Sequence, residues 1–165
     1  MYQGCEYGDD WDDLTSVTLV ASTEYSSSMA VDNLKSEDGY PWHSQKGDQW
    51  VTFQFASNVL LAGFRTKAPN GWDGGHFNEF SFDYSTDGGS NWVTFYEGHG
   101  SNLDCCDWET VIFGTAYISA LTYRLSMKNN HGYNTFIVIQ QLELLHCKSS
   151  NSIVLLTFRI LTSGE

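Results

Sequence analysis

The feature that most limits the fold of this chain is a set of short segments in which apolar and polar residues alternate. Segment 80–85 reads Phe-Ser-Phe-Asp-Tyr-Ser, and segment 50–55 reads Trp-Val-Thr-Phe-Gln-Phe. A period of two indicates a half-buried β-strand, because successive side chains of a strand point to opposite faces. No long segment has the 3.6-residue period of an α-helix, and the best helical candidate, Ser28–Leu34, is short.

Further strands are expected over residues 60–66, 91–96, 110–113, 121–127 and 136–145, with clusters of Gly, Asn and Asp between them. Asp87-Gly88-Gly89 lies between two of the expected strands and predicts a β-hairpin. A total of about eight strands predicts an all-β fold, an antiparallel β-sandwich of the jelly-roll type. In such a fold the loops at the ends of the sandwich carry the function.

Charge and motifs exclude several classes of function. Eight Lys and Arg residues face twenty Asp and Glu residues, which gives a net charge of −12. Such a surface repels phosphate, so neither a nucleic acid nor an anionic membrane is expected as a partner. Signatures of serine hydrolases, zinc proteases, P-loops and dinucleotide sites are absent from the sequence, so we expect no enzyme. No signal peptide or membrane-spanning segment is visible.

The four cysteines do not have the spacing of a zinc site. Cys5 and Cys147 bracket most of the chain, and a disulfide between them would indicate an oxidising compartment. The alternative is four buried thiols. The adjacent Cys105 and Cys106 form a vicinal disulfide, stay reduced, or bond to another chain.

An ordered series of segments resembles a known family. The series consists of Val20–Thr23, Ser28–Leu34, Trp42–Ser44, Asp48–Phe55, Leu61–Thr66, Phe80–Gly88, Trp92, Tyr123–Leu125 and Leu142–Cys147. In this order and spacing, the chain resembles the coagulation factor V/VIII type C domain, also called the discoidin domain. The resemblance runs from about Cys5 to Cys147 and implies the galactose-binding-like jelly roll of that family.

The resemblance implies that Cys5 pairs with Cys147 and that the protein is extracellular or secreted. It divides the chain into an acidic lead-in over 1–16, a discoidin-like domain over 17–147 closed by that disulfide, and a tail over 148–165 outside the family domain. The tail has high strand propensity, so it is a candidate for oligomerisation through edge pairing. Lipid-binding members carry apolar spikes, but the matching segment here, 25–29, is mostly serine.

The loop over 68–76 is the leading candidate for a ligand site. Sugar sites place an aromatic plate beside a few polar groups. Trp72 stands in a Gly-rich loop and is the candidate plate, with Asn70, Asp73 and His76 as polar partners. The alternative is that Trp72 folds back as a lid on the sandwich.

Two other segments complete the ligand face that the resemblance implies. The resemblance assigns Trp42 to the core and directs His43 toward the ligand loops. The segment 129–133 resembles the family loop that completes this face, and it supplies Asn130, His131 and Tyr133. A plain turn is the alternative for that segment.

The resemblance also suggests one structural calcium ion. In sugar-binding relatives an early Asp and a late Glu hold the ion, and Asp32 and Glu143 match those places, with Asp38 as a looser candidate. The alternative is that all three are ordinary surface acids. The vicinal cysteines resemble those of fucose-binding lectins, but Leu103 and Trp108 replace the flanking arginines of that branch.

Together these features predict an extracellular, lectin-like carbohydrate-binding module, with a galactose-type glycan or glycoprotein as its partner. The alternative is a protein–protein cell-adhesion module of the same fold.

Overall fold

The computed structural model describes residues 11–12, 14–36, 39–72, 74–114, 118–132 and 136–147. Several residues singled out above lie outside this part of the chain: Cys5, Asp38, Asp73, Tyr133, most of the acidic lead-in and the tail over 148–165.

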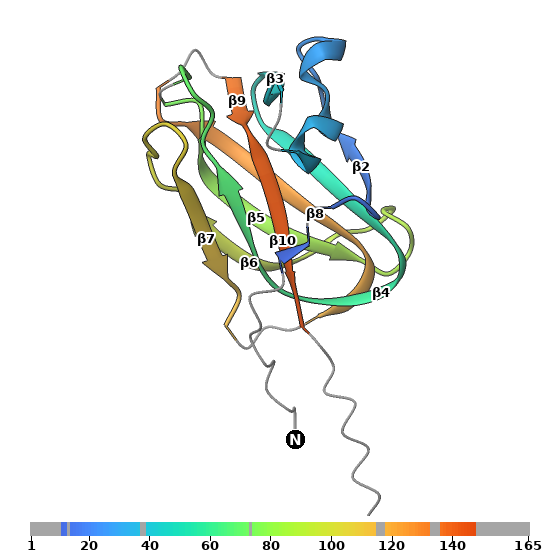
Figure 1. Ribbon diagram of the computed structural model, residues 1–165. Coiled ribbons are helices and arrows are strands. Elements are labelled where there is room, and N and C mark those ends of the chain that lie inside the picture. Colours follow the sequence, from blue (N-terminus) through green and yellow to red (C-terminus); the bar gives the residue numbers. More distant parts are fainter. Residues whose placement is uncertain are drawn as a thin grey trace, which may run out of the picture.

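Two antiparallel layers form a β-sandwich, which confirms the predicted fold class (Figure 1). The first layer has the strand order β2 (Thr18–Ala21), β4 (Gln49–Lys67), β8 (Ser119–Asn130), β5 (Phe77–Ser85) and β6 (Val93–His99). The second layer contains β1 (Trp11–Asp12), β10 (Gln141–His146), the end of β4 and β7 (Trp108–Ile112). The pairing of β1 with β10 brings the two ends of the domain together.

Strand β4 belongs to both layers. Its first part pairs with β2 and β8, and its last part pairs with β10 and β7. The register against β8 shifts between Gln54 and Val59, which is an irregularity that lets a strand bend. Two separate strands were expected here because residues 56–58 break the apolar alternation. These residues are exposed but remain extended, so the strand continues through the bend.

Other boundaries also differ from the expected ones. Two short 3₁₀ helices, η1 (Ser27–Met29) and η2 (Val31–Lys35), replace the expected helix over 28–34. The expected strand over 136–145 is divided at Gln140 into β9 (Phe136–Ile139) and β10, because β9 pairs with β3 (Trp42–Lys46) in a small separate sheet. No helix in the described part of the chain is long and apolar enough to cross a membrane.

The predicted hairpin joins β5 to β6. The Asp87 carboxylate accepts hydrogen bonds from the backbone N–H groups of Ser90 and Asn91 at 3.0 and 2.9 Å. Gly88 and Gly89 have φ values of +73° and +96°, a region that glycine enters without strain. The Gly-rich turn and the Asp87 cap therefore explain why the chain reverses here.

Aromatic side chains fill the space between the layers. The ring of Phe82, on β5, lies 5.9 Å from the ring of Phe53 and 5.3 Å from that of Phe64. Phe64 belongs to the part of β4 in the second layer, so this contact joins the two sheets. All three rings are fully buried. Packing of this kind gives the loops a rigid base.

Tyr123 fixes the bend of β4 from inside the core. Its hydroxyl donates a hydrogen bond to the Val59 carbonyl at 2.8 Å and accepts one from the Ala120 N–H at 3.1 Å. Burial raises the pKa of the Tyr123 phenol to about 12. The hydroxyl therefore stays protonated at neutral pH and holds the bend to β8.

Replacing Tyr123 with phenylalanine is expected to lower the free energy of unfolding by about 1–3 kcal/mol, because the Val59 and Ala120 groups lose a buried partner. Urea denaturation measures this change. Tyr84→Phe is the matched control, since Tyr84 is half-buried on β5 and no hydrogen bond involves its hydroxyl within the described residues. A loss no larger than that of the control would contradict the assigned role.

Candidate functional site

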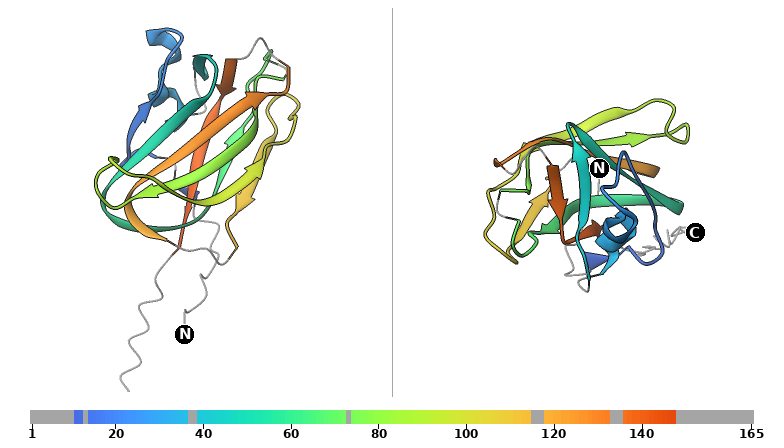
Figure 2. Two further views of the ribbon diagram at one scale, coloured as in Figure 1. Left: turned by 180° about the vertical axis from the view of Figure 1, so that it is seen from behind. Right: turned by 90° about the horizontal axis from the view of Figure 1, so that it is seen from above.

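Several loops meet at one end of the sandwich, the upper end in Figure 1, and Figure 2 shows the same grouping from behind. The loop over 68–76 lies between two neighbours. On one side, Gly74 and Gly75 carbonyls accept hydrogen bonds from the N–H groups of His131 and Val138, both at 2.9 Å. On the other side, Ala68 exchanges two backbone hydrogen bonds with the loop that contains Cys106. These bonds hold the candidate ligand loop in place.

Four rings from four parts of the chain form an aromatic cluster at this end: Tyr25, His43, Trp72 and Phe136. The His43 ring is central, with centroid distances of 4.8 Å to Tyr25, 4.8 Å to Trp72 and 4.9 Å to Phe136. Tyr25 is 58% exposed, whereas His43 is only 3% exposed. Trp72 and Phe136 are half-buried. The outer three rings therefore offer surface to a ligand, and His43 supports them from below.

The small sheet of β3 and β9 positions this cluster. His43 pairs with Val138 across the two strands, and its carbonyl accepts the Tyr25 N–H at 2.8 Å. The His43 Nδ1 hydrogen-bonds the Ser44 carbonyl at 2.7 Å, which orients the imidazole. The Ser44 hydroxyl in turn accepts the Ile137 N–H at 2.9 Å. His43 and Phe136 thus stand on paired strands, and Tyr25 and Trp72 reach them from loops.

A polar hollow of about 280 Å³ adjoins the cluster, lined by Gly47, Asp48, Asn129 and Asn130. The Asn130 side chain links the two, because its Nδ2 donates to the Phe136 carbonyl at 2.5 Å. Asp48 and Asn129 are exposed and present a carboxylate and an amide to solvent. Such an aromatic surface beside convergent polar groups is the usual composition of a small-molecule site.

Three residues singled out from the sequence lie at this surface: Trp72 and His43 belong to the cluster, and Asn130 lines the hollow. Their role in ligand binding stays a prediction. Asn70 is exposed on the same loop as Trp72. His131 is half-buried, and its Nε2 hydrogen-bonds the Gly100 carbonyl at 3.0 Å, so this side chain joins two loops.

His76 differs from the prediction, because it faces the interior. Its side chain is 2% exposed, and its Nε2 is hydrogen-bonded to the Thr66 hydroxyl at 2.8 Å. Its ring packs 4.2 Å from that of Phe77. The loop turns inward at Gly75 to start β5, which carries His76 beneath the surface. Within this arrangement His76 has no contact surface for a ligand, and it serves as an internal support of the loop.

Residues 14–142, most of the chain, match the F5/8 type C domain family. This chain belongs to that family. No curated protein sequence matches it.

Solved structures similar to this F5/8 type C domain share its fold at low sequence identity. The F5/8 type C domain of a Bacteroides fragilis protein has a TM-score of 0.70 and 13% identity over 86% of this chain and 100% of that one. CpGH89CBM32-5 from Clostridium perfringens, solved with GalNAc-β-1,3-galactose, has a TM-score of 0.67 and 17% identity over 82% and 99%. The family 32 module of C. perfringens NanJ, solved with galactose, has a TM-score of 0.68 and 13% identity over 81% and 96%.

The described cysteines of this F5/8 type C domain lie at two places. Cys105 and Cys106 form a vicinal disulfide in an exposed loop, and Cys106 has a φ of +70°. Its backbone hydrogen bond to Ala68 puts the disulfide loop next to the start of the candidate ligand loop. Cys147 is also disulfide-bonded, while Cys5 lies outside the described residues, so the pairing of Cys5 with Cys147 stays a prediction.

The described carboxylates of the suggested calcium site do not fit that ion. Asp32 is exposed and forms an ion pair with Lys35 at 2.9 Å. Glu143 accepts a hydrogen bond from Arg65 at 2.7 Å, and the Trp108 ring holds the Arg65 guanidinium at 4.5 Å. A fixed guanidinium on the carboxylate repels a divalent cation. Within the described residues, no three His, Cys, Asp or Glu side chains gather into a metal-binding group. Calcium therefore stays a prediction without support from these contacts.

Sequence reasoning did not single out Tyr25 and Phe136, which belong to the aromatic cluster, or Asp48, which lines the hollow. Tyr25 is a lone aromatic among serines, so the argument that singled out Trp72 among glycines applied to it as well. Phe136 and Asp48 carried no such signal, because each stands at the edge of a strand pattern.

Proposed function

We propose that this F5/8 type C domain is an extracellular carbohydrate-binding module that binds galactose-type glycans at the loop end of the sandwich. The aromatic cluster beside the polar hollow carries the proposal. The apolar face of a sugar ring packs on an aromatic plate, while its hydroxyls need polar partners at the rim. Trp72 acts as the plate, Tyr25 as a side wall, and Asp48 with Asn130 as hydroxyl partners.

Two further observations support a neutral glycan. The chain has a net charge of −12, so an anionic ligand meets long-range repulsion and a neutral sugar does not. The solved relatives from C. perfringens were obtained with galactose and with GalNAc-β-1,3-galactose. In this proposal the domain acts as a binding module without catalytic activity.

The alternative function is protein–protein adhesion through the same loops. The exposure of Tyr25 and Tyr40, at 58% and 62%, favours it, because tyrosine is enriched at protein interfaces. The hollow favours sugar binding over adhesion, since a flat protein partner would leave the polar groups of the hollow unpaired. A glycan array of the oxidised domain separates the two functions. Selective binding to terminal galactose-type sugars supports the proposal, and a blank array with folded protein favours adhesion.

Replacing Trp72 with alanine is expected to weaken glycan binding at least about tenfold, because an aromatic plate of this kind contributes about 1.5 kcal/mol. Calorimetric titration with the best array ligand measures the change. Trp108→Ala is the control, since Trp108 packs on Arg65 and Lys67 and contacts neither the cluster nor the hollow. Equal affinities of Trp72→Ala and the unmodified domain would remove Trp72 from the site.

Repeating the array with a chelator tests the calcium prediction separately. The ion pairs at Asp32 and Glu143 lead us to expect the same binding with and without chelator. Loss of binding in chelator would contradict this expectation, because it would show that glycan binding needs a divalent cation.

A further inference from the structure

A second hollow of about 230 Å³ lies on the outer face of the first layer. Val51 and Phe53 of β4 are fully buried in the core, so the alternating residues Trp50, Thr52 and Gln54 point outward and line this hollow. Residues of β8 and of the β5–β6 hairpin complete it.

This hollow shares no lining residue with the hollow at the loop end. Its near edge lies close to that hollow, because Trp50 comes two residues after Asp48, about 7 Å along the chain at roughly 3.3 Å per residue. Its far edge is the β5–β6 hairpin, at the opposite end of β5 from the loop over 68–76. The two hollows are therefore distinct, neighbouring sites.

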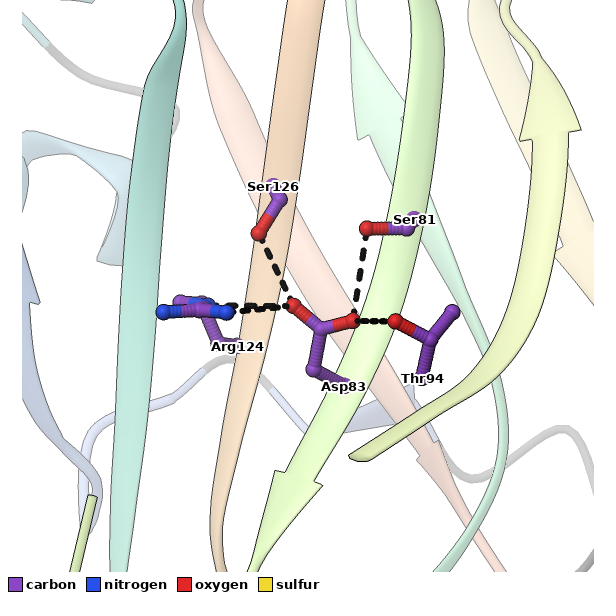
Figure 3. Close-up of polar contacts among 5 residues, drawn as sticks. All are labelled: Ser81, Asp83, Thr94, Arg124 and Ser126. Carbon is purple, nitrogen blue, oxygen red and sulfur yellow. Dashed lines mark hydrogen bonds and ion pairs between the residues drawn. The ribbon is translucent and has the colours of Figure 1, made fainter. Parts of the chain in front are cut away.

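Buried polar contacts fix Arg124 on this face (Figure 3). The Asp83 carboxylate is 2% exposed, and its Oδ2 accepts hydrogen bonds from Nε and Nη2 of Arg124, both at 3.0 Å. The same oxygen accepts the Ser126 hydroxyl at 2.9 Å, while Oδ1 accepts Thr94 at 2.6 Å and Ser81 at 3.3 Å. Asp83 thus orients the guanidinium and balances its charge. Nη1 makes no hydrogen bond within the described residues and can donate to a ligand.

Two tryptophans stand in the walls of the hollow. Trp92 packs on Arg124, with the guanidinium carbon 4.3 Å from the ring centre, and Ser85 holds the hairpin by accepting the Gly89 N–H at 2.8 Å. Trp50 is half-buried, and no other ring or cation packs on its indole within the described residues. Trp50 therefore offers an aromatic face on a rigid strand, with Gln54 and Arg124 close by.

We propose that this hollow is a second binding site, which takes one neutral ring of a carbohydrate. Trp50 provides the plate, and Gln54, Thr122 and Arg124 provide the hydroxyl partners. Neutrality follows from the Asp83–Arg124 pair, which leaves no net positive charge to attract an acid. The volume lies below the roughly 300–1,000 Å³ of drug-sized sites, which fits a single ring better than a longer segment.

The surface is unsuited to an added β-strand, because the hollow lies on a sheet face where the backbone groups are already paired. The choice of a sugar rests on these side chains and not on the site at the loop end. With two sites, one domain can hold two branches of a glycan and gain effective concentration for the second contact.

The test is a titration of the ¹⁵N-labelled full chain followed by the indole N–H signals of its tryptophans in two-dimensional NMR spectra. The probes are methyl β-galactoside, methyl β-glucoside, N-acetylglucosamine and glucuronate, up to about 100 mM, because single sugar sites are often near 1 mM. We expect the Trp50 and Trp92 signals to shift saturably with at least one neutral probe. Trp50→Ala and, separately, Gln54→Ala should weaken that binding at least about fivefold.

The Trp72 signal reports the loop-end site in the same spectra, so failure at one site is distinguished from failure at the other. Gln54 is exposed, so its substitution tests the hollow in a protein that stays folded. No shift of the Trp50 and Trp92 signals with any neutral probe would overturn the proposal. An equal or larger shift with glucuronate would overturn the assignment of a neutral ligand.

Discussion

Replacing Asp83 with alanine is expected to destabilise the domain by about 3 kcal/mol, because it removes the acidic partner of a largely buried ion pair. Arg124, Ser126 and Thr94 each lose a hydrogen-bond acceptor in this variant. The guanidinium is left without its counter-charge under the Trp92 ring. Arg124 is 25% exposed, so water reaches part of the stranded charge, and the loss lies at the lower end of the range for buried pairs.

Urea denaturation of the Asp83 variant measures this loss. Glu97→Ala is the matched control, since Glu97 is an exposed acid on the neighbouring strand β6 and is expected to change stability by less than about 0.5 kcal/mol. Adding Arg124→Met to Asp83→Ala should recover part of the loss, because the stranded charge is then removed. If the double variant is as unstable as the sum of the singles, the pair does not act as described.

Lowering the pH from about 6.5 to about 4 is expected to weaken the fold through His76. Burial lowers the pKa of His76 from 6.5 to about 4, so in this window the unfolded chain binds a proton that the folded chain excludes. The contribution of His76 to the free energy of unfolding is therefore complete above pH 6.5 and decreases as the pH falls toward 4. Below pH 4 this contribution does not change further. A shift of this size corresponds to about 3 kcal/mol.

The charged neighbours of His76 act on its pKa in opposite directions. The Nδ1 lies 3.7 Å from Glu109 Oε2, and neither atom makes a hydrogen bond within the described residues. Glu109 instead accepts hydrogen bonds from Ser101 through its other oxygen. His131 adds repulsion when it is charged. The Glu109 carboxylate favours the protonated form of His76, but the cost of burying the charged ring is larger.

Unfolding measured at a series of pH values tests this prediction against His76→Gln. The variant should lose most of the dependence between pH 6.5 and 4, whereas His99→Gln, at an exposed histidine, should keep it. An unchanged slope in His76→Gln would show that other groups cause the acid sensitivity.

The fold was predictable because it depends on local periodicity. Alternation over 80–85 puts Phe80 and Phe82 in the core, and the Asp-Gly-Gly turn reverses the chain after them. The bend of β4 was not predictable, because Tyr123, far away in the sequence, holds Val59, which follows the residues that break the pattern.

The site was predictable only in part. A tryptophan in a Gly-rich loop is hard to bury, which singled out Trp72 for the candidate site. Tyr25 and Phe136 join it through His43, and that meeting depends on the pairing of β3 with β9. His76 lies only four residues from Trp72, yet the turn at Gly75 sends it inward.

The sequence by itself therefore determined the fold class, the hairpin and the acidic surface, since each follows from the order of neighbouring residues or from composition. Only the tertiary structure decided which aromatic rings meet, which histidine is buried, and that Trp50 shares a hollow with Trp92 and Arg124. The physical reason is that strand pairing joins segments that are remote in the chain, and burial depends on what each segment packs against.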